Sequence, residues 1–293
     1  MFRHHVGLTL VTLLLASCGL LTAHAQTEVP GSLVKVGSYT ASTDYLNLSQ
    51  YYQTTRTTQV RVAFVPTHGF GNQVTRQLTL PKGTTVAGYL TTQKMGTHLR
   101  PALLLYVSRL SDHLLATAQP AGYTVDPTAD TDNTATVITK STHLTAFKRV
   151  ACPRYMPGYS HGDLYLGGVA AAVSPQEPTS TSLRITPDGY VELLTYDPNV
   201  REGLGFYQQP TSQAKIRRTN FHDPYRELTV DHRLSGLHLK RVGQTYRLTL
   251  HNLHQPQHIA GQPLRGIAGT FDSLYRVGGT PYYTFIGFDG ASD

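Results

Sequence analysis

The sequence predicts a mainly β protein, with two antiparallel β-sandwich or small β-barrel domains after an N-terminal signal peptide. Composition is the first observation: 18 tyrosines and 26 glycines against 3 methionines and no tryptophan favour strands and turns over a helical bundle. The second is a hydrophobic fraction of 40% with 15% charged residues, which provides a core and excludes whole-chain disorder. The third is a series of short runs that alternate apolar and polar residues between turn residues.

Residues 1–25 have the three parts of a secretory signal peptide. Arg3 is followed by an apolar stretch from Val6 to about Leu21 and by the small-residue ending Ala23-His24-Ala25. The stretch is shorter than the ~20 apolar residues that cross a bilayer, and no other run approaches that length, so we expect no transmembrane segment in the mature chain. Cleavage after Ala25 would make the protein secreted or periplasmic, with Gln26 as its first residue.

Cys18 offers a second route of processing. Leu15-Ala16-Ser17-Cys18 resembles a bacterial lipobox, in which the cysteine is lipidated and anchors a lipoprotein in a membrane. The apolar region continues past Cys18 towards Ala25, which favours the first route and leaves the second as the alternative. Either route leaves only Cys152 for pairing, so no intramolecular disulfide is expected, and Cys152 is predicted to be a small buried residue.

A change in composition divides the mature chain. Residues 151–162 hold two prolines and two glycines without periodicity, which is typical of a linker. We therefore expect an N-terminal β-rich domain over residues 26–150 and a C-terminal β-rich domain over residues 163–293.

In the first domain a hairpin is predicted from Thr58–Phe64 and Val74–Leu80. Both segments alternate apolar and polar side chains, although Arg76 falls on the inward side, so the second strand either starts after it or contains a bulge. The stretch Leu103–Ala118 fits either a helix, with Ser111 as its N-cap, or buried strands, and we favour strands.

The clearest local structure in the second domain is a hairpin over Leu183–Leu193. Pro187 and Asp188 favour a type I turn, and Gly189 can take the left-handed conformation after it. The register that follows has two inward apolar pairs and one outward charged pair: Leu183 with Leu193, Ile185 with Val191, and Arg184 with Glu192.

A second hairpin is predicted over Leu237–Leu250. A four-residue loop at residues 241–244 keeps the leucines inward and pairs His238 with Arg247. A two-residue loop at residues 243–244 also fits the alternation, but it pairs Lys240 with Arg247, and facing like charges disfavour it. In both alternatives His238, Lys240 and Arg247 form a basic outer face, which is the candidate binding site.

Three histidines form a weak candidate metal site. His251, His254 and His258 lie within eight residues and offer three imidazoles to Zn²⁺ or Cu²⁺. Pro256 argues against a continuous helix, and no cysteine or acidic residue completes the set. A strand end and a loop are therefore the favoured interpretation, and no metal or other cofactor is expected.

The run Ser160-His161-Gly162-Asp163 contains a hydroxyl, an imidazole and a carboxylate. Neighbours on an extended segment point apart and rarely form a catalytic triad. His161 and Asp163 are therefore only weak catalytic candidates, and a segment leading into a strand is favoured.

The net charge of +7 is concentrated in one part of the chain: residues 201–251 contain nine Lys or Arg and four Asp or Glu. No nucleic-acid motif accompanies them, and export argues against nucleic acid as a partner. An anionic cell-surface polymer or lipid headgroups fit better. The sequence thus favours a non-enzymatic binding or structural module, exported to the bacterial cell envelope or beyond it. The alternative is a secreted hydrolase with a site at the domain interface.

Overall fold

The computed structural model describes residues 32–36, 39–43, 46, 49–67, 71–125, 136–138, 141–168, 180–196, 209–260 and 269–288. Antiparallel strands dominate these residues, so the predicted mainly β fold is confirmed. The predicted signal peptide, with Cys18 and Ala25, lies outside the described residues. No described helix combines the length and the hydrophobicity that a membrane crossing requires.

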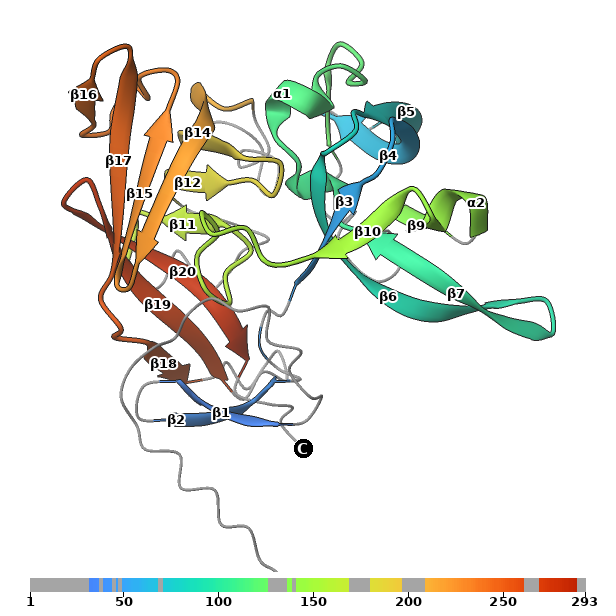
Figure 1. Ribbon diagram of the computed structural model, residues 1–293, viewed down its shortest axis with the longest axis horizontal. Helices are drawn as coiled ribbons and strands as arrows, with labels where there is room; N and C mark the ends of the chain where they lie inside the picture. Colours follow the sequence, from blue (N-terminus) through green and yellow to red (C-terminus); the bar gives the residue numbers. More distant parts are fainter. Residues whose placement is uncertain are drawn as a thin grey trace, which may run out of the picture.

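Two sheets pack together into a β-sandwich in the first half of the chain (Figure 1). One sheet has the strand order β10-β3-β6-β7-β9 and the other β5-β4-β8. Buried side chains from both, among them Phe64, Leu78 and Leu105, form the core between them. A short helix, α2 (Ser141–Leu144), precedes the last strand. The strands are β3 (Gln50–Thr54), β4 (Thr58–Pro66), β5 (Val74–Leu80), β6 (Thr85–Met95), β7 (His98–Leu105), β8 (Tyr123–Val125), β9 (Thr136–Ile138) and β10 (Phe147–Val150).

The predicted hairpin of β4 and β5 forms, with Val62 facing Arg76. Its register is regular throughout β5, so neither the late start nor the bulge that Arg76 suggested is present. Arg76 is exposed because burial on its side of the strand begins only at Leu78.

The segment from Leu103 to Ala118, where the sequence favours strands over a helix, contains both. β7 ends at Leu105 as a buried strand and is followed by the 3-10 helix η2 (Val107–Arg109) and the one-turn helix α1 (Asp112–Leu115). The prediction is therefore right up to Leu105 and wrong beyond it. The first turn of α1 is held by contacts with the second half of the chain, which no local pattern records.

The second half of the chain forms a closed, eight-stranded antiparallel barrel (Figure 1). Its order is β17-β15-β14-β13-β12-β11-β20-β19, and pairing of β19 with β17 closes the ring. β16 and β18 extend the sheet beside β17 and β19. The strands are β11 (Asp163–Tyr165), β12 (Ser182–Ile185), β13 (Tyr190–Leu194), β14 (Ser212–His222), β15 (Tyr225–Val230), β16 (Lys240–Val242), β17 (Thr245–Asn252), β18 (Gln257–Ala260), β19 (Gly269–Val277) and β20 (Thr280–Phe288).

Apolar side chains fill the interior of this barrel. Leu183, Val191, Leu228 and Leu250 are among the inward residues, and each is fully buried. A small barrel packed in this way has a core in place of a ligand cavity. Groups of the barrel that could bind a partner therefore lie on its outer surface.

The segment before the sandwich packs on the barrel. β1 (Leu33–Val36) and β2 (Tyr39–Ser42) form a hairpin, and Ala41 joins Phe271 and Ile286 in a small cluster on β19 and β20. Leu46, in the same cluster, also forms an isolated bridge with Gly287. The chain thus contacts the barrel before it enters the sandwich.

Residues 151–162 connect β10 to β11 without a helix or strand. Cys152 is exposed there, so its predicted burial is wrong: this part of the connection runs over the surface. Met156, in contrast, is 2% exposed and packs against the barrel core.

The hairpin of β12 and β13 has the predicted register, with Ile185 opposite Val191 and Arg184 opposite Glu192. Gly189 has a φ of 89°, as the predicted turn requires. The charged pair does not face solvent, however: Glu192 is 1% exposed. The outer face of this hairpin is covered by the sandwich, an arrangement that the alternation within the hairpin cannot show.

The hairpin of β16 and β17 has the two-residue loop, with Val242 opposite Thr245 and Lys240 opposite Arg247. The favoured four-residue loop, with His238 opposite Arg247, is therefore wrong. Gly243 has a φ of 62°, which suits the first position of a type II′ turn. Arg247 also lies 3.5 Å from the Glu227 carboxylate, which reduces the repulsion by Lys240.

Gly189→Val is expected to destabilise the protein by about 1–3 kcal/mol, because a β-branched residue is strained at positive φ. The new side chain would also approach the hydroxyl of Tyr155, which donates a hydrogen bond to the carbonyl of Pro187. Chemical denaturation measures the change. Gly158→Val is the matched control, because Gly158 has no positive φ and no atom near its Cβ position. Equal stability of both variants would contradict the turn.

Candidate functional site

The outer surface of β14, β15, β16 and β17, with the adjoining end of β19, carries most of the exposed cations of the barrel. We call it the basic face. Because Leu228 and Leu248 point into the core, the alternate side chains of β15 and β17 point outward. Within the described strands β14 to β17 the one acid is Glu227, and Asp223 and Asp231 lie in the turns beside these strands. The face is therefore cationic, because its strands contain more Lys and Arg than acids and because alternate side chains point outward.

One row of side chains crosses four strands of the basic face. Arg218 on β14 lies opposite Thr229 on β15. Thr229 lies opposite Arg247 on β17, and Arg247 lies opposite Lys240 on β16. With neighbouring strands ~4.8 Å apart, the row spans roughly 14 Å. Arg218 and Lys240 are exposed, and the side chain of Arg247 is 39% exposed. The row presents three cations to solvent.

A second row on the same face combines aromatic rings with a cation. His222, Tyr225, His251 and Arg276 are successive partners across β14, β15, β17 and β19. The rings of Tyr225 and His251 are stacked with centroids 4.3 Å apart, and His222 lies 5.6 Å from Tyr225 on the other side. Tyr225 is 37% exposed. The three rings, here called the ring platform, thus pack against one another and lie four residues along the strands from the first row.

Of the three residues predicted for binding, the structure brings Lys240 and Arg247 together and leaves His238 apart. His238 is exposed, but it precedes β16 and lies beside Gly278 in the turn between β19 and β20. The sequence did not indicate Arg218, Tyr225 or Arg276 as site residues. Their position on the basic face depends on which strands pair, which the sequence does not show. The local excess of Lys and Arg was the one sequence feature that pointed to a basic surface.

The three candidate metal ligands have separate partners. His251 stacks on Tyr225, the Nε2 atom of His254 lies 3.1 Å from an Asp223 carboxylate oxygen, and the ring of His258 packs against Phe271. Among the described residues, no three His, Cys, Asp or Glu side chains are grouped as metal ligands.

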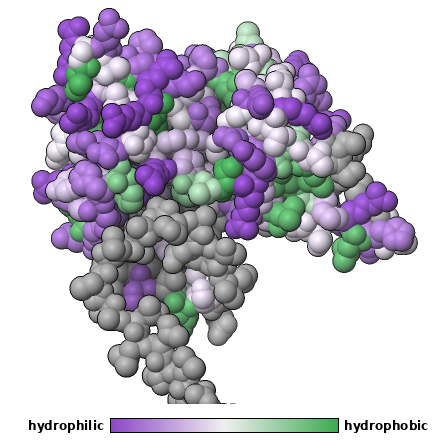
Figure 2. Space-filling model, viewed as in Figure 1, coloured by the Kyte–Doolittle hydropathy of each residue, from purple (hydrophilic) through white to green (hydrophobic). Residues whose placement is uncertain are grey.

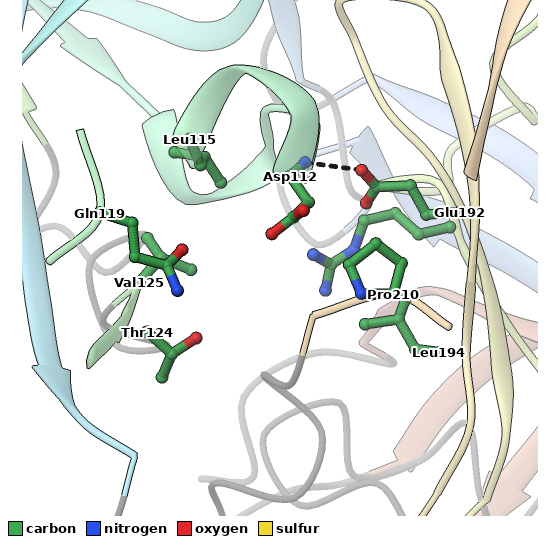
Figure 3. Close-up of a pocket in the computed structure, with 9 residues that line it drawn as sticks. Asp112, Leu115, Gln119, Thr124, Val125, Glu192, Leu194 and Pro210 are labelled. Carbon is green, nitrogen blue, oxygen red and sulfur yellow. Dashed lines mark hydrogen bonds between the residues drawn. The ribbon is translucent and has the colours of Figure 1, made fainter. Parts of the chain in front are cut away.

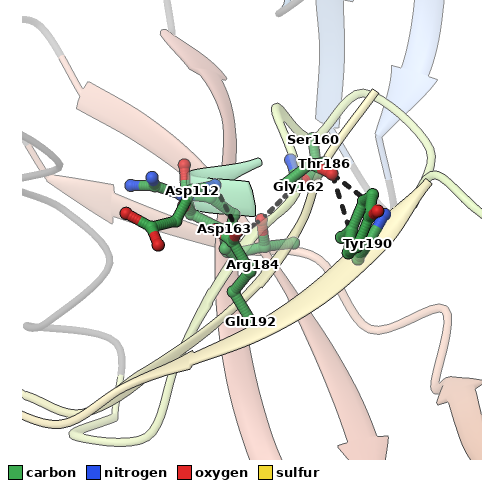
Figure 4. A network of polar contacts seen from close by, with 9 residues as sticks. Asp112, Ser160, Gly162, Asp163, Arg184, Thr186, Tyr190 and Glu192 are labelled. Atoms are coloured by element: carbon green, nitrogen blue, oxygen red, sulfur yellow. Dashed lines mark hydrogen bonds and ion pairs between the residues drawn. The ribbon is translucent and has the colours of Figure 1, made fainter. Parts of the chain in front are cut away.

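Ser160 and Asp163 of the Ser160-His161-Gly162-Asp163 run also contact different partners (Figure 4). The Ser160 hydroxyl lies 2.5 Å from the hydroxyl of Thr284, and the Asp163 carboxylate forms an ion pair with Arg184 at 2.9 Å. Burial, together with the charge of Arg109, holds the pKa of His161 well below its ordinary value. The run forms no triad, and its hydroxyl and carboxylate support β11 and β20.

Carboxylates of the β12–β13 hairpin bind the first turn of α1 in the sandwich. Asp188 accepts hydrogen bonds from the backbone N–H of Ser111 at 2.9 Å and from its hydroxyl at 2.5 Å. Glu192 accepts a bond from the backbone N–H of Asp112 at 2.6 Å. Carboxylates suit the free N–H groups and positive end of a helix. These bonds join the barrel to the sandwich, and the outer charges of the hairpin are buried at this joint.

This joint holds more carboxyl groups than cationic groups. Asp112, Asp163 and Glu192 lie around Arg184 (Figure 4), and Asp188 adds a fourth carboxyl whose charge acts on Glu192. Burial raises the pKa of Glu192 to about 8 and raises the pKa values of Asp188 and Asp112. Glu192 is therefore largely protonated at neutral pH.

The pocket at this joint is small. Its lining includes Leu115, Gln119 and Thr124 from the sandwich and Glu192 from the barrel (Figure 3), and its free space is about 20 Å³. That is room for about one water molecule. The arrangement joins the sandwich to the barrel, and this pocket is too small for a molecule much larger than water.

The basic face and the joint are thus two different polar regions of one molecule: the first is exposed and cationic, the second is buried and acidic. Only the first presents uncommitted charge to a partner. Comparison of the chain with protein-family models, with curated proteins and with solved structures finds no match.

Proposed function

We propose that the protein is an exported, non-enzymatic binding module that holds an anionic polysaccharide of the bacterial cell envelope on its basic face. The observation that carries the proposal is the row of Arg218, Arg247 and Lys240 across adjacent strands. Export rests on the predicted signal peptide at residues 1–25.

Like charges on facing strand positions are unfavourable, by roughly 0.2–1 kcal/mol. Lys240 and Arg247 face each other directly, and the one nearby acid reaches only Arg247. An anionic ligand bound across the row would relieve this repulsion. Such a contact lies at the surface and weakens as salt screens it.

The ring platform favours a polysaccharide over a simple polyanion. Tyr225 is 37% exposed, so the outward part of its stack with His251 offers aromatic surface against which a sugar ring can pack. Arg218 and Arg247 of the cationic row lie four residues from His222 and His251 along β14 and β17, roughly 13 Å, with Glu227 in the row between them. One chain of charged sugars can therefore contact both rows.

Lys240→Gln with Arg247→Gln is expected to weaken retention on immobilised heparin, an anionic polysaccharide probe, with little change in stability. Surface charges contribute little to folding, while each provides attraction that falls as the Debye length shrinks from ~10 Å at 0.1 M salt to ~3 Å at 1 M. We would measure the salt concentration needed for elution, and expect a clearly lower value for the variant.

Lys148→Gln with Arg149→Gln is the matched control, because it removes one Lys and one Arg at exposed positions of β10 in the sandwich. Equal elution of the two double variants would show that only net charge matters and would reject the basic face as the binding site.

Tyr225→Ala tests the ring platform. The variant should bind heparin more weakly than the wild type does, and its binding to polyphosphate, which has no sugar rings, should be unchanged.

A further inference from the structure

The hairpin of β6 and β7 continues well beyond its sheet. β3 pairs with β6 only over residues 85–88, and β9 pairs with β7 only over residues 103–105. The remainder, residues 89–102, is a two-stranded arm whose described strands pair only with each other. In Figure 1 this arm extends away from the body, on the side opposite β16 and β17.

One face of the arm is apolar and exposed. Leu90 lies opposite Leu103, and Leu99 lies opposite Lys94, so both leucines share the face that is buried further along β7. Leu103 is 2% exposed, whereas Leu90 is 59% and Leu99 is 72% exposed. Pro101 lies between them on this face and is exposed as well. The face that is apolar and buried within the sheet is therefore apolar and exposed along the arm.

The arm carries basic side chains and no acidic ones. Lys94, His98 and Arg100 lie at its outer end, and residues 89–102 contain no Asp or Glu. Figure 2 shows hydrophilic and hydrophobic surface side by side at this projecting end. Pairing of the arm with the same arm of a second copy would bring these cations together, which disfavours self-association.

We propose that this arm docks the protein onto an anionic lipid surface. Lys94 shares the face of the two leucines, and Arg100 lies on the opposite face of the two-stranded arm. Exposed leucines close to cations are a combination that interfacial membrane binding uses: apolar side chains enter the boundary of the acyl chains, and cations contact the phosphates. Lys94 can keep its ammonium at the headgroups while its stem lies along the apolar face. The basic face of the barrel, at the other side of the molecule, stays free for its own ligand.

Sedimentation with vesicles tests the proposal. The wild-type protein should bind vesicles of phosphatidylcholine with phosphatidylglycerol, and should bind pure phosphatidylcholine weakly. Leu90→Ser with Leu99→Ser should lower the partition coefficient by about tenfold or more, since each leucine would lose its burial. Lys94→Gln with Arg100→Gln should lower it by on the order of tenfold. All four positions are exposed, so folding should be unchanged.

Leu33→Ser is the control for lost apolar surface, because Leu33 is also 72% exposed but lies on β1. Lys148→Gln with Arg149→Gln is the control for lost charge elsewhere, and both controls should bind as the wild type does. The barrel variant of Lys240 and Arg247 is measured as well, because the basic face also attracts anions. The proposal is overturned if the arm variants bind vesicles as tightly as the wild type, or if only the barrel variant loses binding. Binding of the arm to an acidic polypeptide but not to vesicles would also overturn it.

Discussion

Glu192→Gln is expected to stabilise the protein at pH 8–9 and to change its stability little at pH 4–5. Glu192 is buried at the joint between sandwich and barrel, and its pKa there is about 8. In the unfolded chain the pKa of a glutamate is about 4.3. Glutamine keeps a side-chain oxygen that accepts the N–H of Asp112, but it cannot ionise.

The sign follows from proton binding. Between about pH 4.3 and pH 8 the folded protein holds a proton on Glu192 that the unfolded chain has released, so stability falls as the pH rises. The loss approaches 1.4 kcal/mol for each pH unit within this window and stops above it, where both states are ionised. Burial raises the pKa of Asp272 to about 7, so Asp272 adds a loss of the same sign that ends nearer pH 7.

Chemical denaturation at pH 5, 6, 7, 8 and 9 measures this dependence. The difference in unfolding free energy between Glu192→Gln and the wild type should grow with pH up to about pH 8 and then stay constant. Glu227→Gln is the matched control, since that carboxylate lies partly exposed on the outer barrel surface. A difference for Glu192→Gln that does not vary with pH would show that Glu192 is ionised in the folded protein.

The parts of the fold that the sequence predicts correctly are local. Apolar alternation and Pro187-Asp188-Gly189 define the β12–β13 hairpin, since every pairing within it joins residues close in the chain. Closure of the barrel is different: it depends on the pairing of β17 with β19 and of β11 with β20. The second of these joins strands more than a hundred residues apart. No periodicity within either strand identifies its partner.

The wrong predictions have a related cause: each depends on a contact with a segment outside the pattern from which the prediction was made. Alternation correctly places Arg184 and Glu192 outside the barrel core, but exposure depends on what covers that surface, and here the sandwich does. The like-charge rule disfavoured Lys240 opposite Arg247, yet Gly243 and the carboxylate of Glu227 favour the observed loop. The candidate basic face was therefore only partly predictable, because its rows are built from four strands.

Arg184→Met is expected to cause the largest loss of stability, about 3–5 kcal/mol at pH 8. Removing one member of a buried ion pair leaves its partners charged and uncompensated. Arg184 pairs with Asp163 at 2.9 Å, and its charge also acts on Glu192 and Asp112. Methionine keeps much of the side-chain volume, so the loss reports charge more than packing.

The loss should be smaller at pH 5, where Glu192 and part of the neighbouring carboxyls are protonated and need less compensation. It should also be smaller in the Glu192→Gln background at pH 8, which gives a double-mutant cycle for this pair. Denaturation curves of the two single variants and the double variant at both pH values supply the energies. A loss that is the same at pH 5 and pH 8, with no coupling to Glu192, would mean that Arg184 stabilises the joint by packing alone.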